Sequence, residues 1–189
     1  RLLDVEPVDR LNELIFDLRL ADTTDRVALA EVCRTVPTAS SDDPYSSYFA
    51  DLADRMDNMN VAGHLTGSID LVLRLDGPRF LVVDYKSNRA HPPGDPSWLD
   101  HYEEAPLREE MIKHDYPLQA FLYSVALHRY LRWRLPDYDP STHLAGSAYL
   151  FLRGMVGPPG TDGRTTRVTC WRPPIEAVLS ADRILAGDQ

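Results

Sequence analysis

The sequence predicts an α/β domain, and three of its features carry that prediction. Two strand-like runs, residues 65–75 and 80–85, flank an Asp-Gly-Pro segment, and Asp-Gly between apolar runs is a strong hairpin signal. Residues 116–135 favour a long helix, because apolar side chains recur there at positions i, i+4 and i+7. The chain has 189 residues, which suits a single domain of about 100–200 residues.

The other elements follow from local patterns along the chain. Residues 11–20 alternate apolar and polar side chains from Leu14 onward, which is typical of a half-buried strand. Residues 25–32 indicate a short helix after an Asp or Thr cap, and prolines among polar residues make 35–47 a loop. The remaining expectations are a short helix at 48–56, an irregular proline-rich segment at 90–108, a short helix at 107–113, strands at 147–152 and 165–171, a glycine-rich loop at 154–163 and a terminal helix at 173–185.

The composition excludes several classes of protein. The chain carries 20 Lys and Arg against 29 Asp and Glu, a formal charge of −9, which argues against a protein that coats nucleic acid through bulk charge. Cys33 and Cys170 are too few for a disulfide framework, a four-thiolate zinc site or an iron–sulfur cluster. No apolar run approaches the ~20 residues that span a bilayer, and a reduced, cytoplasmic setting is expected.

The predicted hairpin places two carboxylates opposite one another. If its turn is a three-residue loop, Leu75 opposes Arg79 and Asp70 lies directly across from Asp84, whereas a two-residue loop would break this register. Opposed residues have Cβ atoms about 4.5–5.5 Å apart, where two carboxylates repel unless a positive charge lies between them. Hard oxygen ligands at this spacing suit Mg²⁺ or Mn²⁺.

Side-chain alternation places a lysine beside one of these carboxylates. Lys86 shares a face with Asp84, and it is one of only two lysines in a chain with 18 arginines. A lysine is a compact donor that can titrate when desolvated, so its use here favours a chemical requirement; the alternative is a surface ion pair at a strand end. On the earlier strand we expect Leu65, Ile69, Leu71 and Leu73 on one face, and Thr66, Ser68, Asp70 and Arg74 on the other.

Five ordered motifs give the chain a family resemblance. The split Asp…Asp-x-Lys motif of PD-(D/E)xK nucleases resembles two segments here, Gly67-Ser68-Ile69-Asp70-Leu71 and Asp84-Tyr85-Lys86-Ser87-Asn88. The family's Gln-x-x-x-Tyr helix is similar to residues 116–123 and continues through 126–131, and its following strand is similar to 149–154. More narrowly, nearly the whole chain resembles the nuclease domains at the C-terminus of RecB subunits of RecBCD (exonuclease V).

This resemblance implies a fold and a domain organisation. It implies a restriction-endonuclease-like core, with a central mixed β-sheet flanked by helices, in one domain over residues 1–189. The chain begins with neither an initiator Met nor a signal-peptide pattern, so we expect part of a longer helicase–nuclease chain that lacks the family's upstream helix. That helix usually carries a metal-ligating His, and no His precedes the first strand here. His64, near the hairpin, is the alternative candidate for that role.

The resemblance also implies roles for individual residues. Asp70 and Asp84 would bind the metal together with the main-chain carbonyl of Tyr85. Lys86 would be the catalytic lysine, which orients the attacking water and stabilises charge on the phosphate. Glu13 matches the family's first-strand glutamate and would hold the water or the metal; the alternative is a surface carboxylate at a strand edge.

The long helix adds a polar and aromatic group to the candidate site. Gln119 and Tyr123 lie at i and i+4 and project together. With Tyr116 they would contact DNA or brace the carboxylates; the alternative is the polar edge of a packed helix. Other candidates are expected to be structural: a solvated helix face for Arg129, Arg132 and Arg134, and core or interface anchors rather than base-stacking platforms for Trp98, Trp133 and Trp171.

The function that the resemblance implies is Mg²⁺-dependent hydrolysis of DNA, with Mn²⁺ as the alternative metal and no iron–sulfur cluster. The substrate would be mainly single-stranded DNA from an associated helicase, cut by exonuclease or endonuclease action in double-strand-break repair and recombination. No Gly-x-x-x-x-Gly-Lys-Ser/Thr loop occurs, so the motor would lie elsewhere. The implied partners are RecC and RecD, with RecA as a further one and no membrane, in the bacterial cytoplasm.

Three rival functions remain open. A nuclease-fold module without chemistry would dock a recombinase or partner subunits; the missing upstream His favours it, and the retention of Asp70, Asp84 and Lys86 opposes it. An AddAB-type or CRISPR-adaptation nuclease usually carries a four-cysteine cluster, which two cysteines oppose. The third rival is a small-molecule hydrolase that uses a metal-bound water.

Overall fold

The computed structural model describes residues 5–20, 27–155 and 167–187. Its strands are β1 (Arg10–Arg19), β2 (Val27–Ala28), β3 (Asn60–Val61), β4 (His64–Leu75), β5 (Arg79–Lys86), β6 (Leu144–Phe151) and β7 (Val168–Trp171). Its α-helices are α1 (Leu29–Ala39), α2 (Ser46–Arg55), α3 (Glu104–Lys113), α4 (Tyr116–Arg134), α5 (Pro140–His143) and α6 (Ile175–Ala186). Short 3₁₀ turns cover Pro7–Asp9, Trp98–Tyr102 and Leu152–Gly154.

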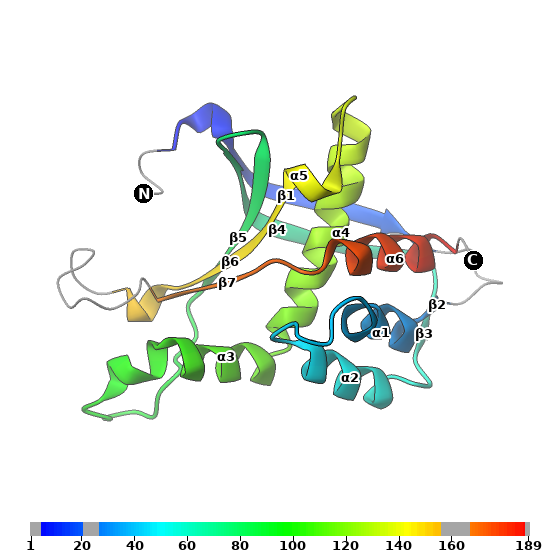
Figure 1. Cartoon of the computed structure of the whole chain (residues 1–189). Coiled ribbons are helices and arrows are strands. Elements are labelled where there is room, and N and C mark those ends of the chain that lie inside the picture. Colours follow the sequence, from blue (N-terminus) through cyan, green and yellow to red (C-terminus); the bar gives the residue numbers. More distant parts are fainter. Residues whose placement is uncertain (1–4, 21–26, 156–166, 188–189) are drawn as a thin grey trace.

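The five longer strands form one mixed sheet in the order β1-β4-β5-β6-β7, and β2 pairs with β3 separately. Strands β5 and β6 are parallel, whereas the other neighbours in the large sheet are antiparallel. Figure 1 shows α4 crossing the sheet, with α1, α2 and α6 grouped beside its lower half. The predicted α/β fold with a central mixed sheet and flanking helices is therefore confirmed.

The helices and the sheet enclose the main core. Apolar side chains from α1, α2, α4 and α6 pack there against Val72, Val82 and Tyr149 of the sheet. A second, smaller cluster contains only residues of the sheet: Leu71, Leu73, Val83, Ala148 and Leu150. Burial of this much apolar surface is the main favourable contribution to folding. The sheet is therefore packed most heavily on the side that carries α4.

The β4–β5 hairpin has the register that the three-residue turn predicts. Leu75 pairs with Arg79, and the ladder continues to Leu71 opposite Val83. Gly77 takes a positive φ of 76° in the turn, a conformation that glycine adopts without steric cost. Regular pairing stops one residue before Asp70 and Asp84, and β5 continues alone beside β6 as far as Lys86.

The expectation that four β4 leucine and isoleucine side chains share one face is wrong. Ile69 packs in the main core, whereas Leu71 and Leu73 belong to the second cluster. The side chains of β4 change face at Asp70. On either side of this point, Leu71 pairs with Asn12 of β1 and Ile69 pairs with Leu14. Between those pairs Glu13 has a φ of 53°, so irregular backbone interrupts the usual two-residue alternation.

Several boundaries differ from expectation because packing outweighs local signals. Helix α1 begins at Leu29 and runs to Ala39, through Pro37 and into the expected loop at 35–47. Its Val32, Cys33 and Val36 are buried, which holds the helix despite the proline. Helix α2 begins two residues before its predicted start, and α3 and β6 each begin three residues before theirs. Helix α4 ends one residue before its predicted end. The expected loop at 154–163 and the strand at 165–171 fall partly outside the described residues.

Candidate active site

Asp70 and Asp84 lie together where the β4–β5 ladder ends. Asp84 is only 3% exposed, although it is a carboxylate at a strand end. Asp70 is half-buried, and its Oδ2 accepts a hydrogen bond of 3.0 Å from the main-chain N–H of Tyr85. That contact places Asp70 beside the β5 segment that carries Asp84. The hairpin therefore brings both predicted carboxylates to one place.

Lys86 is a buried partner of Asp84, so the alternative of a surface ion pair is wrong. Its Nζ lies 2.7 Å from Asp84 Oδ1, and the two side chains are 12% and 4% exposed. The same Nζ donates a hydrogen bond of 2.9 Å to Gln119 Oε1 and lies 3.9 Å from the centre of the Tyr116 ring. The ammonium is thus held from β5 by a carboxylate and from α4 by an amide and an aromatic face.

Gln119 connects three polar side chains. Its Oε1 accepts from Lys86 and also from the hydroxyl of Tyr149, at 3.1 Å, while its Nε2 donates to the hydroxyl of Tyr123 at 3.0 Å. These contacts fix the orientation of the amide, because its carbonyl and amino ends face different partners. Gln119 therefore holds Lys86, with Tyr123 behind it, and the role of the two residues in a site stays a prediction.

Tyr149 is a site residue that the sequence did not single out. It is fully buried on β6, pairs across the sheet with Asp84, and stacks on Tyr116 with ring centres 5.8 Å apart. The sequence marks residue 149 as part of a strand, but the register of a parallel pair cannot be worked out from a turn. The β5–β6 pairing is what brings this hydroxyl to Gln119.

Burial sets the protonation of the site. It raises the pKa of Asp84, the Lys86 ammonium opposes that shift, and Asp70 adds to it. Burial, followed by the charges of Asp84 and Asp70, raises the pKa of Tyr123 to about 12. The pKa values of Tyr116 and Tyr149 are also raised, first by burial and then by Asp84. These hydroxyls therefore stay protonated at neutral pH, and that of Tyr149 donates to Gln119.

Glu13 and His64 are placed differently from the two aspartates. Glu13 lies on β1 between the pairs Asn12↔Leu71 and Leu14↔Ile69, and its side chain is exposed. Among residues 5–20, 27–155 and 167–187, no group of three His, Cys, Asp or Glu side chains converges to hold a metal ion. His64 pairs with Asp17 at 2.7 Å, six residues along β4 from Asp70 or about 20 Å. His64 is therefore no substitute for the upstream ligand.

The donor set at the two aspartates fits a hard divalent cation. Asp84 Oδ1 is buried and accepts no hydrogen bond, since Lys86 approaches it as an ion pair without hydrogen-bond geometry. The Lys86 ammonium balances one carboxylate charge, but Asp70 places a second negative charge beside Asp84. Mg²⁺ is usually bound through one or two carboxylates, with waters and substrate phosphates completing its shell. Asp70 and Asp84 are sufficient as protein ligands on that pattern.

A second polar cluster lies beside the site and was not foreseen. Glu110 on α3 is 6% exposed and accepts hydrogen bonds from Asn88 at 2.8 Å and Lys113 at 3.2 Å. His114 lies 2.9 Å from the same carboxylate, and its ring stacks on Tyr116 at 5.3 Å. The cluster therefore ties the segment after Lys86 to the start of α4. Lys113, the second of the two lysines, is structural here.

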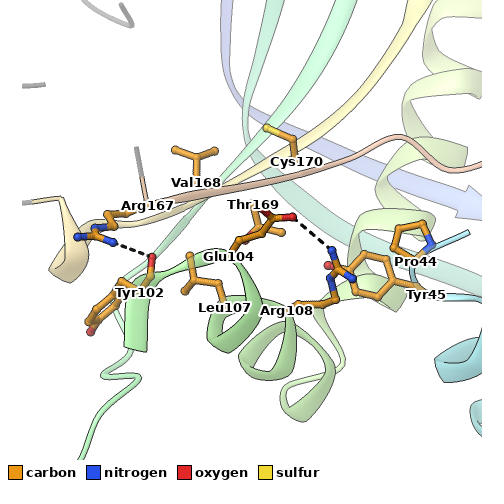
Figure 2. Close-up of a pocket in the computed structure, with 10 residues that line it drawn as sticks. All are labelled: Pro44, Tyr45, Tyr102, Glu104, Leu107, Arg108, Arg167, Val168, Thr169 and Cys170. Carbon is orange, nitrogen blue, oxygen red and sulfur yellow. Dashed lines mark hydrogen bonds and ion pairs between the residues drawn. The ribbon is translucent and has the colours of Figure 1, made fainter. Parts of the chain in front are cut away.

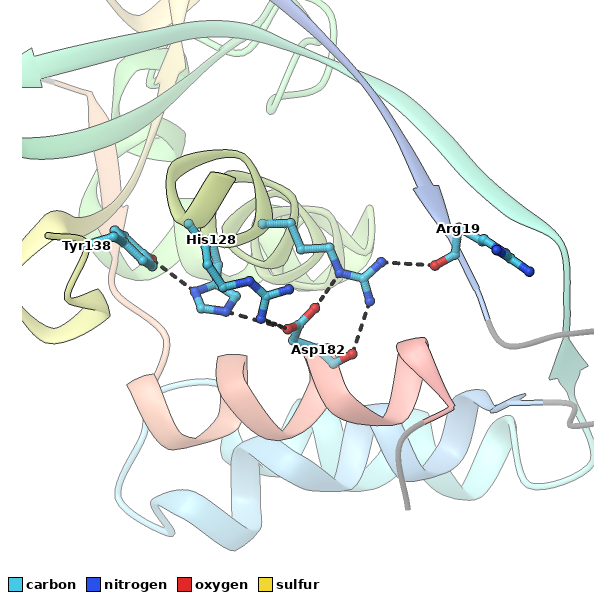
Figure 3. Close-up of polar contacts among 6 residues, drawn as sticks. Arg19, His128, Tyr138 and Asp182 are labelled. Carbon is cyan, nitrogen blue, oxygen red and sulfur yellow. Dashed lines mark hydrogen bonds and ion pairs between the residues drawn. The ribbon is translucent and has the colours of Figure 1, made fainter. Parts of the chain in front are cut away.

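The arginines of α4 are largely structural rather than solvated. Arg129 donates to both the carboxylate and the main-chain carbonyl of Asp182 on α6, and Arg132 donates to the same carboxylate at 2.9 Å. Arg129 also reaches the carbonyl of Arg19 on β1, and His128 contacts Tyr138 at 3.0 Å (Figure 3). These contacts join α4, α6 and the edge strand, so the expected solvated face is wrong for Arg129, whereas Arg132 is 58% exposed.

A pocket of about 250 Å³ lies apart from the aspartates (Figure 2). It is bordered by α3 and β7, with Tyr45, Tyr102 and Cys170 among its lining residues. Glu104 and Arg108 pair across its floor at 3.4 Å. None of the lining residues belongs to the group around Asp84, so this pocket is not the candidate site.

The comparisons with known proteins agree with this geometry. A family model described as the PD-(D/E)XK nuclease superfamily matches residues 11–178. The RecBCD enzyme subunit RecB of Mycobacterium tuberculosis is 45% identical over 190 residues, which cover 94% of this chain and 16% of that protein. RecB of Mycolicibacterium smegmatis is 40% identical over 188 residues, covering 95% of this chain and 17% of that protein.

A further relative matches a shorter stretch. RecB of Escherichia coli is 46% identical over 101 residues, covering 51% of this chain and 8% of that protein. The chain thus spans about one sixth of the length of the two mycobacterial relatives. In the part of the chain that the structure describes, no helix is both long and apolar enough to cross a membrane.

Proposed function

The chain belongs to the PD-(D/E)XK nuclease superfamily, and from that premise we propose that it is a Mg²⁺-dependent deoxyribonuclease acting on single-stranded DNA. The observation that carries this proposal is the buried Asp84–Lys86 pair beside Asp70, with side chains 4% and 12% exposed. Burying a charged pair is costly, so a pair held by three further polar or aromatic groups is more consistent with chemistry than with stability alone.

The two aspartates are the proposed metal ligands, with Mn²⁺ as an alternative to Mg²⁺. A divalent cation bound there supplies positive charge that stabilises the transition state of phosphodiester hydrolysis. The main-chain carbonyl of Tyr85 and the carboxylate of Glu13 remain proposed additional groups. The Glu13 side chain is exposed to solvent. In that position it would hold a water molecule near the phosphate of the bound DNA.

Lys86 is the proposed catalytic lysine. Its ammonium is aimed by Gln119 Oε1 and by the Tyr116 ring, so it approaches Asp84 from a fixed direction. A positioned donor stabilises charge on the phosphate oxygens as the water attacks, without reorganising during the step. Gln119 and Tyr149 act through Lys86 and are positioning residues.

The relatives suggest a biological setting. They are named as subunits of a RecBCD enzyme, and we propose that this chain works in such an assembly with RecC-type and RecD-type subunits. Its single-stranded substrate would then come from an associated helicase during double-strand-break repair in the bacterial cytoplasm. Docking of RecA on this domain is a further part of the proposal.

The test is cleavage of a 5′-labelled single-stranded oligonucleotide with 5 mM Mg²⁺, about a typical assay level. Wild type and the exposed control Asp51→Asn on α2 are expected to cleave, whereas Asp84→Asn is expected to lose at least 100-fold in rate. Duplex DNA and an RNA of the same sequence test the substrate class. Equal cleavage by wild type and Asp84→Asn would overturn the assignment of the active site, and no cleavage by wild type would favour the rival module without chemistry.

A further inference from the structure

The C-terminal end of α4 carries an exposed aromatic surface that the candidate active site does not use. Trp133 is 76% exposed, so it is not a core residue of this chain. The guanidinium of Arg134 lies 4.6 Å from the centre of the Trp133 ring and 5.6 Å from that of Tyr130. An exposed tryptophan layered with an arginine is typical of surfaces that bind a ligand by stacking.

The same side of α4 carries the site residues. Gln119, Tyr123, Ala126, Tyr130 and Trp133 follow one another at spacings of four, three, four and three residues. That spacing puts all five on one stripe of a helix. Ten residues separate Tyr123 from Trp133, or about 15 Å along the helix axis. The stripe therefore leads from the residues around Lys86 to the exposed tryptophan.

A groove runs beside the outer part of this stripe. Residues 14–19 of β1 form one wall and Ala126, Arg129, Tyr130 and Trp133 of α4 the other, enclosing about 330 Å³. Ile15 on the β1 wall is 78% exposed. At the inner end, the Phe16 ring meets the Tyr123 ring edge-on, with centres 5.9 Å apart. The groove thus opens next to a residue of the candidate active site.

The charges along the groove favour an anionic ligand. Arg19 lines it and Arg134 flanks it, in a chain whose formal charge is −9, whereas the charge of Arg129, which also lines it, is balanced by Asp182. The one acid among the lining residues is Asp17, which is paired with His64. Arginines beside exposed aromatic rings match a phosphate backbone with stacked bases better than they match a purely apolar partner.

We propose that the α4 platform, which consists of Ile15, Tyr130, Trp133 and Arg134, binds single-stranded nucleic acid that leads to the candidate active site, about 15 Å away along α4. A base stacks at Trp133, and a phosphate lies near Arg134. Only an unpaired base exposes its ring face for such stacking, so the platform selects single strands over duplexes. This inference rests on the proposed function, because it takes DNA as the substrate of the neighbouring site.

The test is fluorescence anisotropy with a labelled dT oligonucleotide of about 12 residues, in EDTA so that no cleavage occurs. Trp133→Ala is expected to weaken binding about tenfold, and Trp133→Phe, which keeps an aromatic face, by less than threefold. Val8→Ala is the matched control, because Val8 is 79% exposed and lies outside the groove. A plot of the logarithm of the binding constant against the logarithm of the salt concentration is expected to become less steep by about one unit of slope in Arg134→Ala.

The outcomes separate this inference from the proposed function. Asp84→Asn is expected to bind the oligonucleotide as wild type does while losing cleavage. If wild type binds through Trp133 but never cleaves, the platform stands and the nuclease proposal fails. If Trp133→Ala binds as tightly as wild type, or weakens duplex binding equally, the platform is overturned. The platform is also overturned if Trp133→Ala abolishes self-association in analytical ultracentrifugation and leaves oligonucleotide binding unchanged. The surface would then be an interface between two copies of the chain.

Discussion

At the scale of single residues, Lys86 is the position where the geometry is most restrictive. Asp84 lies on one side of its ammonium, and Gln119 and the Tyr116 ring lie on the others. This enclosure suits a compact ammonium and not a planar guanidinium. Two predictions follow from it.

Lys86→Arg keeps the charge but changes its shape. We expect cleavage to fall at least 100-fold, because the fork-shaped group cannot occupy the same point between Asp84 and Gln119. Single-turnover rates with saturating DNA measure the effect, and oligonucleotide affinity in EDTA serves as the binding control. A variant within about threefold of the wild-type rate would show that any cation suffices.

Tyr149→Phe removes one hydrogen bond and keeps the ring that stacks on Tyr116. Without the Tyr149 hydroxyl, the Gln119 amide is held less firmly toward Lys86, so we expect kcat to fall about tenfold with KM unchanged. Tyr138→Phe is the matched control, since its hydroxyl contacts His128 outside the site. A rise in KM alone, or equal effects of the two variants, would argue against positioning through Gln119.

At the scale of elements, strand register determines whether these residues meet. The β5–β6 register shifts between Phe80 and Leu81, next to Gly146, before the strands run on to pair Asp84 with Tyr149. Gly146 has a φ of 97°, and a Cβ there would lie 2.5 Å from the Trp171 carbonyl oxygen. The site thus depends on a glycine in the neighbouring strand.

Gly146→Ala tests that dependence. We expect it to lower the free energy of unfolding by about 3 kcal/mol, from left-handed backbone strain plus the clash with main-chain atoms. Gly63→Ala is a close control, because Gly63 has a φ of 94° with nothing within 4 Å of an added Cβ. Urea denaturation compares the two. If both variants lose the same free energy of unfolding, backbone strain alone accounts for the destabilisation by Gly146→Ala.

A buried ionic cluster holds α6 on α4. Burial alone would raise the pKa of Asp182, but His128, Arg129 and Arg132 outweigh it and hold that pKa well below its usual range. The folded state therefore prefers the charged carboxylate. This contribution to stability is complete above the unfolded pKa of about 3.9 and is lost as the pH falls below it.

Asp182→Asn should remove that contribution. At pH 7 we expect a loss of about 3 kcal/mol, because two arginines lose a buried partner. The difference between wild type and variant should shrink as the pH falls below about 4. Urea denaturation at several pH values measures it. A difference that stays constant from neutral to acidic pH would rule out the carboxylate charge as its cause.

At the scale of the whole molecule, the sequence predicted most of what lies close together along the chain. The turn predicted the β4–β5 register and hence the meeting of Asp70 and Asp84. Helix α4 was predicted to within one residue, because its apolar spacing is regular. Gln119 and Tyr123 were then identified by their spacing and their family motif.

Long-range contacts were beyond the reach of local patterns. Nothing in the sequence gives the parallel register that places Tyr149 against Gln119, or the approach of α3 that buries Glu110. Period-two alternation failed on β4 beside Glu13, where the backbone of the neighbouring strand β1 is irregular. The exposure of Trp133 also depends on tertiary packing, since tryptophan more often lies in the core or at an interface.

The central claim is that the two hairpin aspartates hold a divalent ion. Titration of Mn²⁺ followed by electron paramagnetic resonance tests it most directly, because bound and free Mn²⁺ give different signals. The account predicts saturable binding by wild type and by Asp51→Asn, and an affinity at least about tenfold lower for Asp84→Asn. Mn²⁺ binding of equal strength by wild type and Asp84→Asn would contradict it.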